Sequence, residues 1–292
     1  GAVAQGLIWG IMAIGVYLTF RILDIADLTV DGSLGTGGAV CIMLMLSGQN
    51  VWVAMAGATA AGMAAGLATG ILHTFMGIPA ILAGILTQLG LYSINLKTMG
   101  KANQAINVDK YDLLVSLRFI RKVPFYKNTI LIVAIAIILL IVVLYWFFGT
   151  ELGCSLRATG CNDKMARAQG INTDFNRVLG LMISNGLVAL SGAMLCQYQG
   201  FADINMGRGA IVIGLAAVII GEAIFGKVFR NFGFKLLAVA LGSIIYYLVL
   251  QVVIWLGIDT DLLKLLSAGV VAVFLAIPTW KSRYFSNMGK RG

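Results

Sequence analysis

The sequence predicts an all-α membrane protein with about eight to ten transmembrane helices. Of its 292 residues, 60% are hydrophobic and 11% are charged, with a mean hydropathy of +0.93, whereas a soluble domain carries about 25% charged residues. Many apolar runs reach the ~20 residues that a helix needs to cross the hydrocarbon core. The period-two alternation of a transmembrane barrel is absent, so we treat residues 1–292 as a single transmembrane domain.

The first predicted span covers Val3–Phe20, and the second follows a turn-rich acidic segment and runs to about Leu46. The second span contains Gly-Thr-Gly-Gly at 35–38, where each glycine costs a helix about 1 kcal/mol relative to alanine. Two explanations stay open for this cluster: close approach of a neighbouring backbone, or a broken helix that lines a cavity. In the third span, Val51–Leu72, small residues at four-residue spacing predict a helix-packing face formed by Gly62, Gly66 and Gly70.

Six further apolar segments follow, and a long loop over 97–127 is too polar to cross the membrane. Within this loop, Leu113–Ile120 is expected to lie on the membrane surface as a short amphipathic piece. The short segment Ala210–Phe225 is a candidate re-entrant or broken span. The other predicted spans are residues 79–96, Thr129–Phe148, Val178–Gln199, Leu236–Leu256 and Leu262–Ile277.

The central loop, residues 150–177, is a polar, cation-bearing segment between two long apolar runs. Asn162 can cap a short helix over Asp163–Gln169, and Gly170 can end it. Position 172 or 173 then offers a cap for the next span. A simple connection between two spans does not require a short helix with its own cap and stop. We therefore interpret this helix as an element that another protein binds. An ordinary helical connector stays open as the alternative.

The distribution of Lys and Arg sets the expected orientation. Placing the central loop in the cytoplasm leaves a small excess of these cations on the cytoplasmic side. The basic loop over 97–127 then lies outside the cell, against the usual bias, and nine spans would place the N-terminus outside as well. We therefore expect a cytoplasmic central loop and an extracytoplasmic 97–127 loop.

Several function classes are disfavoured. The net charge of +9 comes from loops and the C-terminus, and the chain has neither a basic-aromatic strand pattern nor Cys/His finger spacing, so we expect no nucleic-acid partner. Cys154 and Cys161 have no His nearby, and we predict no metal site. The run 221–228 imitates a phosphate-binding loop but places Val228 where a magnesium-binding hydroxyl is needed. We predict no catalytic residues and no enzymatic activity.

Polar side chains within the apolar runs are candidates for a substrate path, because their burial in a membrane is costly. Amides and hydroxyls suit an uncharged or zwitterionic polar solute, although they can equally bond neighbouring helices. Glu222 is instead expected to pair with Lys227 or Arg230 at a helix end. The substrate-path candidates are Thr29, Asp31, Ser33, Gln88, Asn185 and Gln197.

Three separated motifs resemble a known family. The central loop resembles the cytoplasmic loop of permeases in bacterial ABC importers for branched-chain amino acids and simple sugars, through Gly153, Arg157, Ala158, Gly160, Asn162, Ala166, Ala168, Gly170 and Ile171. The run NGLVALSGAML at 185–195 resembles the small-residue stretch that follows this loop in the family. The segments at 26–40 and 85–103 resemble a narrower branch, the permeases encoded beside tryptophan- and tyrosine-type binding lipoproteins.

The resemblance implies a multi-pass permease subunit of the bacterial inner membrane. Its short helix would be a coupling helix that docks on a separate ABC ATPase, present in two copies. That ATPase would hold ATP and magnesium, and this chain would hold no cofactor. A second permease copy, forming a homodimer, and an extracytoplasmic substrate-binding lipoprotein would complete an importer for a small solute, best an amino acid and more narrowly an aromatic one. The coupling residues would be Arg157, Asn162, Asp163, Lys164, Met165, Arg167, Gln169 and Gly170.

The alternative function is a stand-alone, ion-coupled secondary transporter or a channel, which would transport solute without an ATPase. Such a protein relies on acidic or His relays within its spans. The sequence offers little for this, since Glu222 and His73 are the main candidates within or beside the spans of the chain. Association with an ATPase separates the two hypotheses.

Overall fold

The computed structural model describes residues 1–107, 110–111, 113–116 and 128–256, with 265, 268–269, 271–273 and 276. This part is nearly all helical, which confirms the predicted class of a polytopic all-α membrane protein. The predicted ninth span, Leu262–Ile277, falls largely outside the described residues. Within them, seven helices are long and apolar enough to span a membrane: α1 with the π-helix η1 that continues it (Ala2–Ile22), α2 (Thr29–Leu46), α3 (Val51–Thr74), α4 (Ala80–Met99), α5 (Thr129–Phe148), α8 (Thr173–Gln199) and α10 (Phe232–Trp255).

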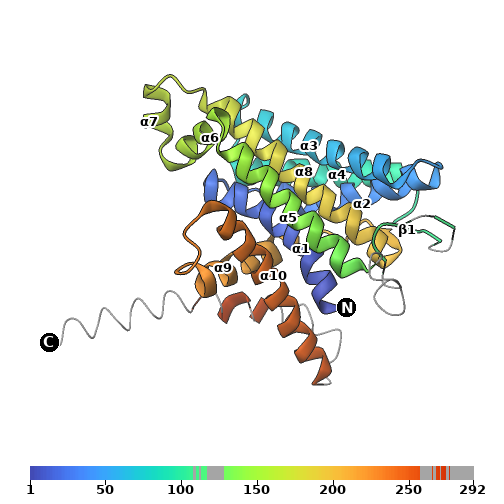
Figure 1. Ribbon diagram of the computed structural model, residues 1–292. Helices are drawn as coiled ribbons and strands as arrows, with labels where there is room; N and C mark the ends of the chain where they lie inside the picture. Colours follow the sequence, from blue (N-terminus) through green and yellow to red (C-terminus); the bar gives the residue numbers. More distant parts are fainter. Residues whose placement is uncertain are drawn as a thin grey trace.

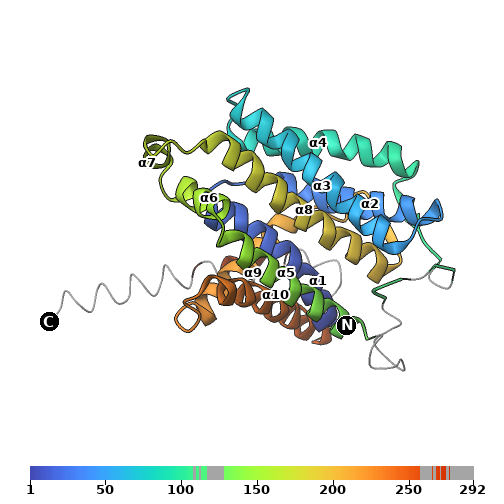
Figure 2. The same cartoon turned by 45° about the horizontal axis from the view of Figure 1, so that its top comes forward.

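Helices α1 and α8 form the centre of the bundle. α8 packs against α1, α2 and α3, while α1 also packs against α5, α9 (Ala210–Phe225) and α10. α4 lies on the outer side of α2 and α3 (Figure 2). The short helices α6 (Glu151–Cys161) and α7 (Asp163–Ala168) lie at one end of the bundle, and the N-terminus and strand β1 (Asn103–Ala105) lie at the opposite end (Figure 1).

Glycine residues bring α3 and α8 into backbone contact. Gly62, Gly66 and Gly70 lie on the face of α3 that meets α8, and a Cβ added at Gly66 would overlap the carbonyl oxygen of Leu181. Small residues at four-residue spacing allow membrane helices to approach this closely, where dispersion contacts and weak hydrogen bonds hold them together. The spacing seen in the sequence therefore corresponds to a helix pair in backbone contact at the centre of the bundle.

The glycine cluster in the second span has the same cause. α2 is continuous through residues 35–38, and a Cβ added at Gly37 would overlap the carbonyl oxygen of Ala189 on α8. Close approach of a neighbouring backbone therefore explains the cluster. The other explanation, a helix broken at this point, is wrong, because the helical hydrogen bonds run on to Leu46.

The chain re-enters the bundle before α9. Strand β2 (Phe201–Asp203) pairs antiparallel with β1, with Gln104 opposite Ala202, a pairing that the sequence did not predict. Beyond β2 the chain turns back, and Gly207 packs against the backbone carbonyl of Asp31 in the first turn of α2. α9 has 16 residues, so it is about 24 Å long and shorter than the ~30 Å hydrocarbon core. The segment therefore crosses from the end that carries β1 toward the end that carries α6, where Glu222 lies beside Arg21. Of the two forms expected here, it corresponds to the broken span and not to a re-entrant one.

The expected pairing of Glu222 with Lys227 or Arg230 is wrong. Arg21, in η1 (Leu18–Ile22), donates from Nε to both carboxylate oxygens of Glu222, at 3.0 and 3.1 Å, and its Nη2 forms an ion pair with the same carboxylate. α9 packs along the first span, so a cation that is remote in sequence lies closer than the cations that follow Glu222. Sequence proximity was a poor guide to this long-range contact.

Candidate functional site

Helix α6 anchors the central loop to the end of the first span. The Thr150 side chain caps α6 by accepting a backbone N–H of its first turn at 3.4 Å. Gly160 packs so closely that an added Cβ would overlap the carbonyl oxygen of Ile22, and one added at Gly180 would overlap the Leu23 side chain. α6, the first half of α8 and the chain at 22–23 are therefore in direct contact. Helix α6 was not expected from the sequence.

The short helix α7 forms where the sequence predicted it. The Oδ1 atom of Asn162 accepts the N–H of Met165 at 3.1 Å, which caps the helix. Gly170 has a φ of 81°, a left-handed conformation that ends the helical segment at little steric cost. Asn172 then caps α8 by accepting a backbone N–H of its first turn at 3.1 Å. The predicted helix, cap and stop are confirmed, although α7 ends at Ala168, one residue early.

A network of charges clamps α7 to the start of α8. Arg167 donates from Nε to the hydroxyl of Thr173 at 2.8 Å and from Nη2 to Asp174 at 3.1 Å. Arg177 pairs with Asp163 at 3.3 Å. Each exposed pair alone contributes little, about 0–1 kcal/mol, but a network shared among several charges holds its geometry better. We therefore treat α7 and the first turns of α8 as one rigid unit.

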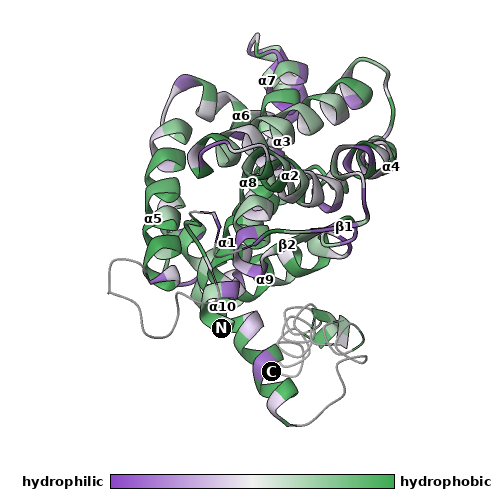
Figure 3. Cartoon of the chain, turned by 90° about the vertical axis from the view of Figure 1, so that its right-hand side faces the viewer, coloured by the Kyte–Doolittle hydropathy of each residue, from purple (hydrophilic) through white to green (hydrophobic). Residues whose placement is uncertain are grey.

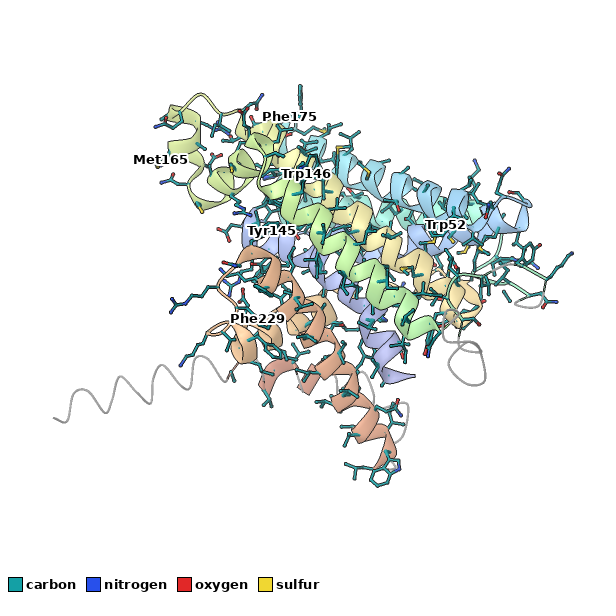
Figure 4. All side chains as sticks on the ribbon, viewed as in Figure 1. Trp52, Tyr145, Trp146, Met165, Phe175 and Phe229 are labelled. Atoms are coloured by element: carbon teal, nitrogen blue, oxygen red, sulfur yellow. The ribbon has the colours of Figure 1, made fainter. Side chains whose placement is uncertain are left out.

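The outward face of α7 is exposed to solvent in the described part of the chain. Lys164, Met165, Gln169 and Gly170 are all exposed, and the Met165 side chain is 62% exposed. Figure 4 shows Met165 on α7 at the tip of the bundle. An exposed methionine is a soft, adaptable contact residue of the kind used at binding surfaces.

Arg157 lies apart from this face. Its guanidinium carbon is 4.3 Å from the ring centroid of Phe232 on α10 and 5.4 Å from that of Phe148 on α5. Cation–π contacts of this kind contribute about 0.5–2 kcal/mol, more when they are shielded from water. Of the predicted coupling residues, Arg157 therefore holds α6 against α5 and α10, whereas the others belong to α7 and the turn after it.

A buried polar cluster joins the linker between the first two spans, residues 23–28, to α2 and α8. Asp27 accepts the N–H of Thr29 at 2.9 Å and the Nδ2 amide of Asn185 at 2.7 Å. The hydroxyl of Ser33 donates to the Oδ1 atom of Asn185 at 2.6 Å. Burial raises the pKa of Asp27, and its hydrogen bonds with Thr29 and Asn185 oppose that shift. Three of the substrate-path candidates thus meet here, and the fourth member, Asp27, was missed.

The cluster extends through three hydroxyls toward an open groove. Thr29 and Thr69 place their Oγ1 atoms 2.7 Å apart, and Thr69 donates to Thr87 at 2.9 Å. Thr87 lies on the wall of a groove of about 510 Å³ between α2, α3 and α4. Larger apolar side chains line it together with small and polar ones, and the small and polar ones include Thr36, Ala61, Ala64, Ala68, Thr87, Gly90, Asn95 and Thr98. The signal for this groove in the sequence is the helical spacing of 87, 91, 95 and 98 on α4.

The remaining substrate-path candidates lie elsewhere. Asp31 accepts the N–H groups of Gly209 and Ile211, at 3.0 and 2.9 Å, and so caps the N-terminus of α9. Gln197 accepts the N–H of Leu114 at 3.2 Å, near the start of the expected amphipathic segment, whose residues beyond 116 lie outside the described part. Gln88 is partly exposed on α4. Asp31 and Gln197 thus have bonding partners within the chain.

Replacing Asp27 by Ala is expected to lower the free energy of unfolding by about 2–5 kcal/mol. The change removes both acceptors, so the N–H of Thr29 loses its partner and the Nδ2 amide of Asn185 keeps only its bond to the carbonyl of Leu181. Each buried donor left unsatisfied costs about 1–3 kcal/mol. The measurement is the thermal midpoint of the purified protein in detergent. Asp24→Asn is the control, because it removes an exposed carboxylate of the same linker and keeps a residue that tolerates the φ of 55° found there. Equal midpoints for the two variants would contradict the structural role of Asp27.

Comparison with known proteins identifies the family. The model of the branched-chain amino acid transport system permease component matches residues 1–281 of the chain. The chain belongs to this permease family. It is therefore a multi-pass permease subunit of an ABC transporter in the bacterial inner membrane, and its relatives are permease components, not enzymes. Membership of the family implies an ATPase partner and a binding-protein partner.

Several relatives cover most of the chain. The tyrosine transport system permease protein of Clostridioides difficile is 39% identical over 275 residues, which are 93% of this chain and 88% of the relative. An uncharacterised protein of Rickettsia prowazekii is 36% identical over 279 residues, 94% of this chain and 95% of the relative. The autoinducer 2 import system permease protein LsrC of Yersinia pestis is 30% identical over 214 residues, 72% of this chain and 58% of the relative. No solved structure matches the chain.

Proposed function

We propose that this permease imports an aromatic amino acid and is driven through α7 by a separate ATPase. The observation that carries the proposal is the rigid, capped α7, which projects from one end of the bundle with Met165 and Lys164 outward. In this arrangement α7 faces the cytoplasm and docks on the ATPase, which holds ATP and magnesium. The sequence has no complete nucleotide-binding motif, which agrees with this division of labour.

A continuous set of contacts joins α7 to the groove. The clamp between Arg167 and Asp174 ties α7 to α8, and α6 and α8 both touch the chain at 22–23. From there Asp27 bonds to Thr29, and the hydroxyl relay leads on to Thr87 in the groove wall. Closure of an ATPase pair would shift α7, and these contacts would transmit the shift to the linker at 23–28 and to α4. The groove would then open alternately to the two sides of the membrane.

The groove suits a small amphipathic solute. Its volume of about 510 Å³ is within the range of small-molecule sites, and hydroxyls and an amide interrupt an otherwise apolar wall. An aromatic ring would lie on the small residues, and its polar groups would bond to the hydroxyls. The relative named as a tyrosine transport permease supports an aromatic amino acid. A second copy of the chain would close the groove, and the binding lipoprotein would dock at the end that carries β1 and β2.

Transport in proteoliposomes tests this proposal. The permease, reconstituted with its ATPase and binding protein, is expected to take up labelled tyrosine only with ATP, and excess phenylalanine should compete whereas leucine should not. Ala64→Leu narrows the groove and should reduce uptake at least tenfold, while Ala60→Leu makes the same change outside the groove lining. Uptake without the ATPase, driven by an ion gradient, would instead favour the secondary transporter.

A further inference from the structure

A second groove lies between α5 and α10, away from the proposed path. It has a volume of about 470 Å³ and an almost wholly apolar lining, which includes Ile138, Val142, Tyr145, Asn231, Gly233 and Leu237. Gly233 keeps the space open, because any larger side chain would approach the Tyr145 ring, 3.3 Å from an added Cβ. The groove is thus a slot between two helices with a narrow, apolar cross-section.

This groove faces the hydrocarbon of the membrane. α5 carries no charged or amide side chain, and its outward residues Ile138 and Val142 are 57% and 60% exposed. Figure 3 shows α5 and α4 at opposite edges of the bundle, so the groove lies on the side away from the polar wall of α4. No water is present at this depth of the membrane to fill an apolar groove. A lipid acyl chain is therefore the molecule that can occupy it.

Cations and aromatic rings gather at one end of the groove. Arg230 directly precedes the lining residue Asn231, and Lys235 directly follows the lining residue Phe234; both cations are exposed. The segment 226–235 contains no acidic residue. The nearby carboxylate of Glu222 is bonded to Arg21 and therefore does not neutralise them.

The aromatic rings have the positions of membrane-interface anchors. Phe229 stacks between Phe225 and Phe234, with ring centroids 5.5 and 5.4 Å apart, beside the cations. Tyr145 and Trp146, at the end of α5, are 57% and 71% exposed and lie on the same side (Figure 4). Tyrosine and tryptophan are enriched at the headgroup level of a bilayer. The cationic end of the groove thus lies at the depth of lipid phosphates.

We propose that the α5–α10 groove is a binding site for an anionic glycerophospholipid, with an acyl chain in the groove and the phosphate at Arg230 and Lys235. The leaflet is the cytoplasmic one if α7 faces the cytoplasm, and that assignment rests on the proposed function. The lipid would fill the space beside the contact of Arg157 with Phe148 and Phe232, which joins α5, α6 and α10. Binding of this lipid would therefore stabilise the part of the bundle that supports the central loop.

Mass spectrometry of lipids retained by the detergent-purified permease tests the site without any ATPase. The wild type is expected to retain phosphatidylglycerol at least fivefold above its share of the membrane, and phosphatidylethanolamine at or below its share. The double variant Arg230→Gln and Lys235→Gln should lower the phosphatidylglycerol enrichment to the membrane ratio. The control, Lys97→Gln with Lys101→Gln, makes the same charge change at exposed positions in the last turn of α4 and just beyond it, and should keep the enrichment.

A second variant tests the acyl-chain part of the site. Gly233→Leu fills the groove and should lower the phosphatidylglycerol retained even though both cations remain. Inorganic phosphate at millimolar concentration should not displace the lipid, because it lacks the acyl chain. Equal enrichment in the wild type and the Arg230/Lys235 double variant, equal loss in the control, or displacement by phosphate alone would each overturn the proposal. Its failure would leave the coupling role of α7 unaffected.

Discussion

Gly66→Leu is expected to prevent the bundle from folding to its native packing. A Cβ at this position would already overlap the carbonyl oxygen of Leu181, and the three further carbons of leucine have no space between α3 and α8. Overpacking typically costs 1–3 kcal/mol when side chains can move aside, and more is expected here because the obstacle is backbone. That loss is a large share of the 5–15 kcal/mol by which a protein is stable. The measurement is the yield of monodisperse protein in detergent, expected to fall at least tenfold.

Gly90→Leu is the matched control for this prediction. Gly90 lies on α4, and a Cβ added there meets no atom within 4 Å. The same substitution should therefore leave the yield and the thermal midpoint near those of the wild type, whatever it does to transport through the adjoining groove. A Gly66→Leu protein that purifies and melts like the wild type would show that α3 and α8 do not pack through this face.

Met165→Asp is expected to abolish coupling and leave the permease folded. Met165 is 62% exposed, so the change costs the isolated chain little. In a docked complex the new carboxylate would be buried without a partner at the centre of the α7 face, at several kcal/mol. A loss of 2 kcal/mol alone weakens docking about 30-fold. Co-purification of the ATPase and ATP-driven uptake should both fall to background, at an unchanged thermal midpoint.

The control for this variant is Met76→Asp. Met76 follows α3, is 66% exposed and belongs to a turn at the same end of the bundle as α7. It therefore repeats the chemistry of the change, methionine to aspartate at an exposed site, without touching α7. If both variants lost the ATPase equally, α7 would not be the specific docking element. If neither lost it, the coupling role of α7 would be contradicted outright.

Local features were predictable from the sequence. Asn162 and Gly170 act on backbone groups within a few residues, so the short helix between them follows from capping chemistry alone. The spans follow from the length of their apolar runs, because each helix satisfies its own backbone hydrogen bonds. The four-residue spacing of Gly62 and Gly66 likewise pointed to a packing face without naming the partner helix.

Long-range features were not predictable from the sequence. The pairing of Glu222 with Arg21, the stacking of Arg157 on Phe232 and the pairing of β1 with β2 each join segments far apart in the chain. Nothing in the local pattern distinguishes these partners from nearer ones. The glycine cluster at 35–38 also allowed two explanations until the position of α8 decided between them.

Site-specific photo-crosslinking at Met165 in living cells tests the central claim most directly. A photoreactive phenylalanine analogue placed there occupies the exposed tip of α7, and it should crosslink in high yield to one cytoplasmic polypeptide that binds ATP. The same analogue at the exposed Leu89, on the side of α4, should not capture that polypeptide. A Met165 adduct with an extracytoplasmic protein, or no adduct with any ATP-binding subunit, would contradict the account.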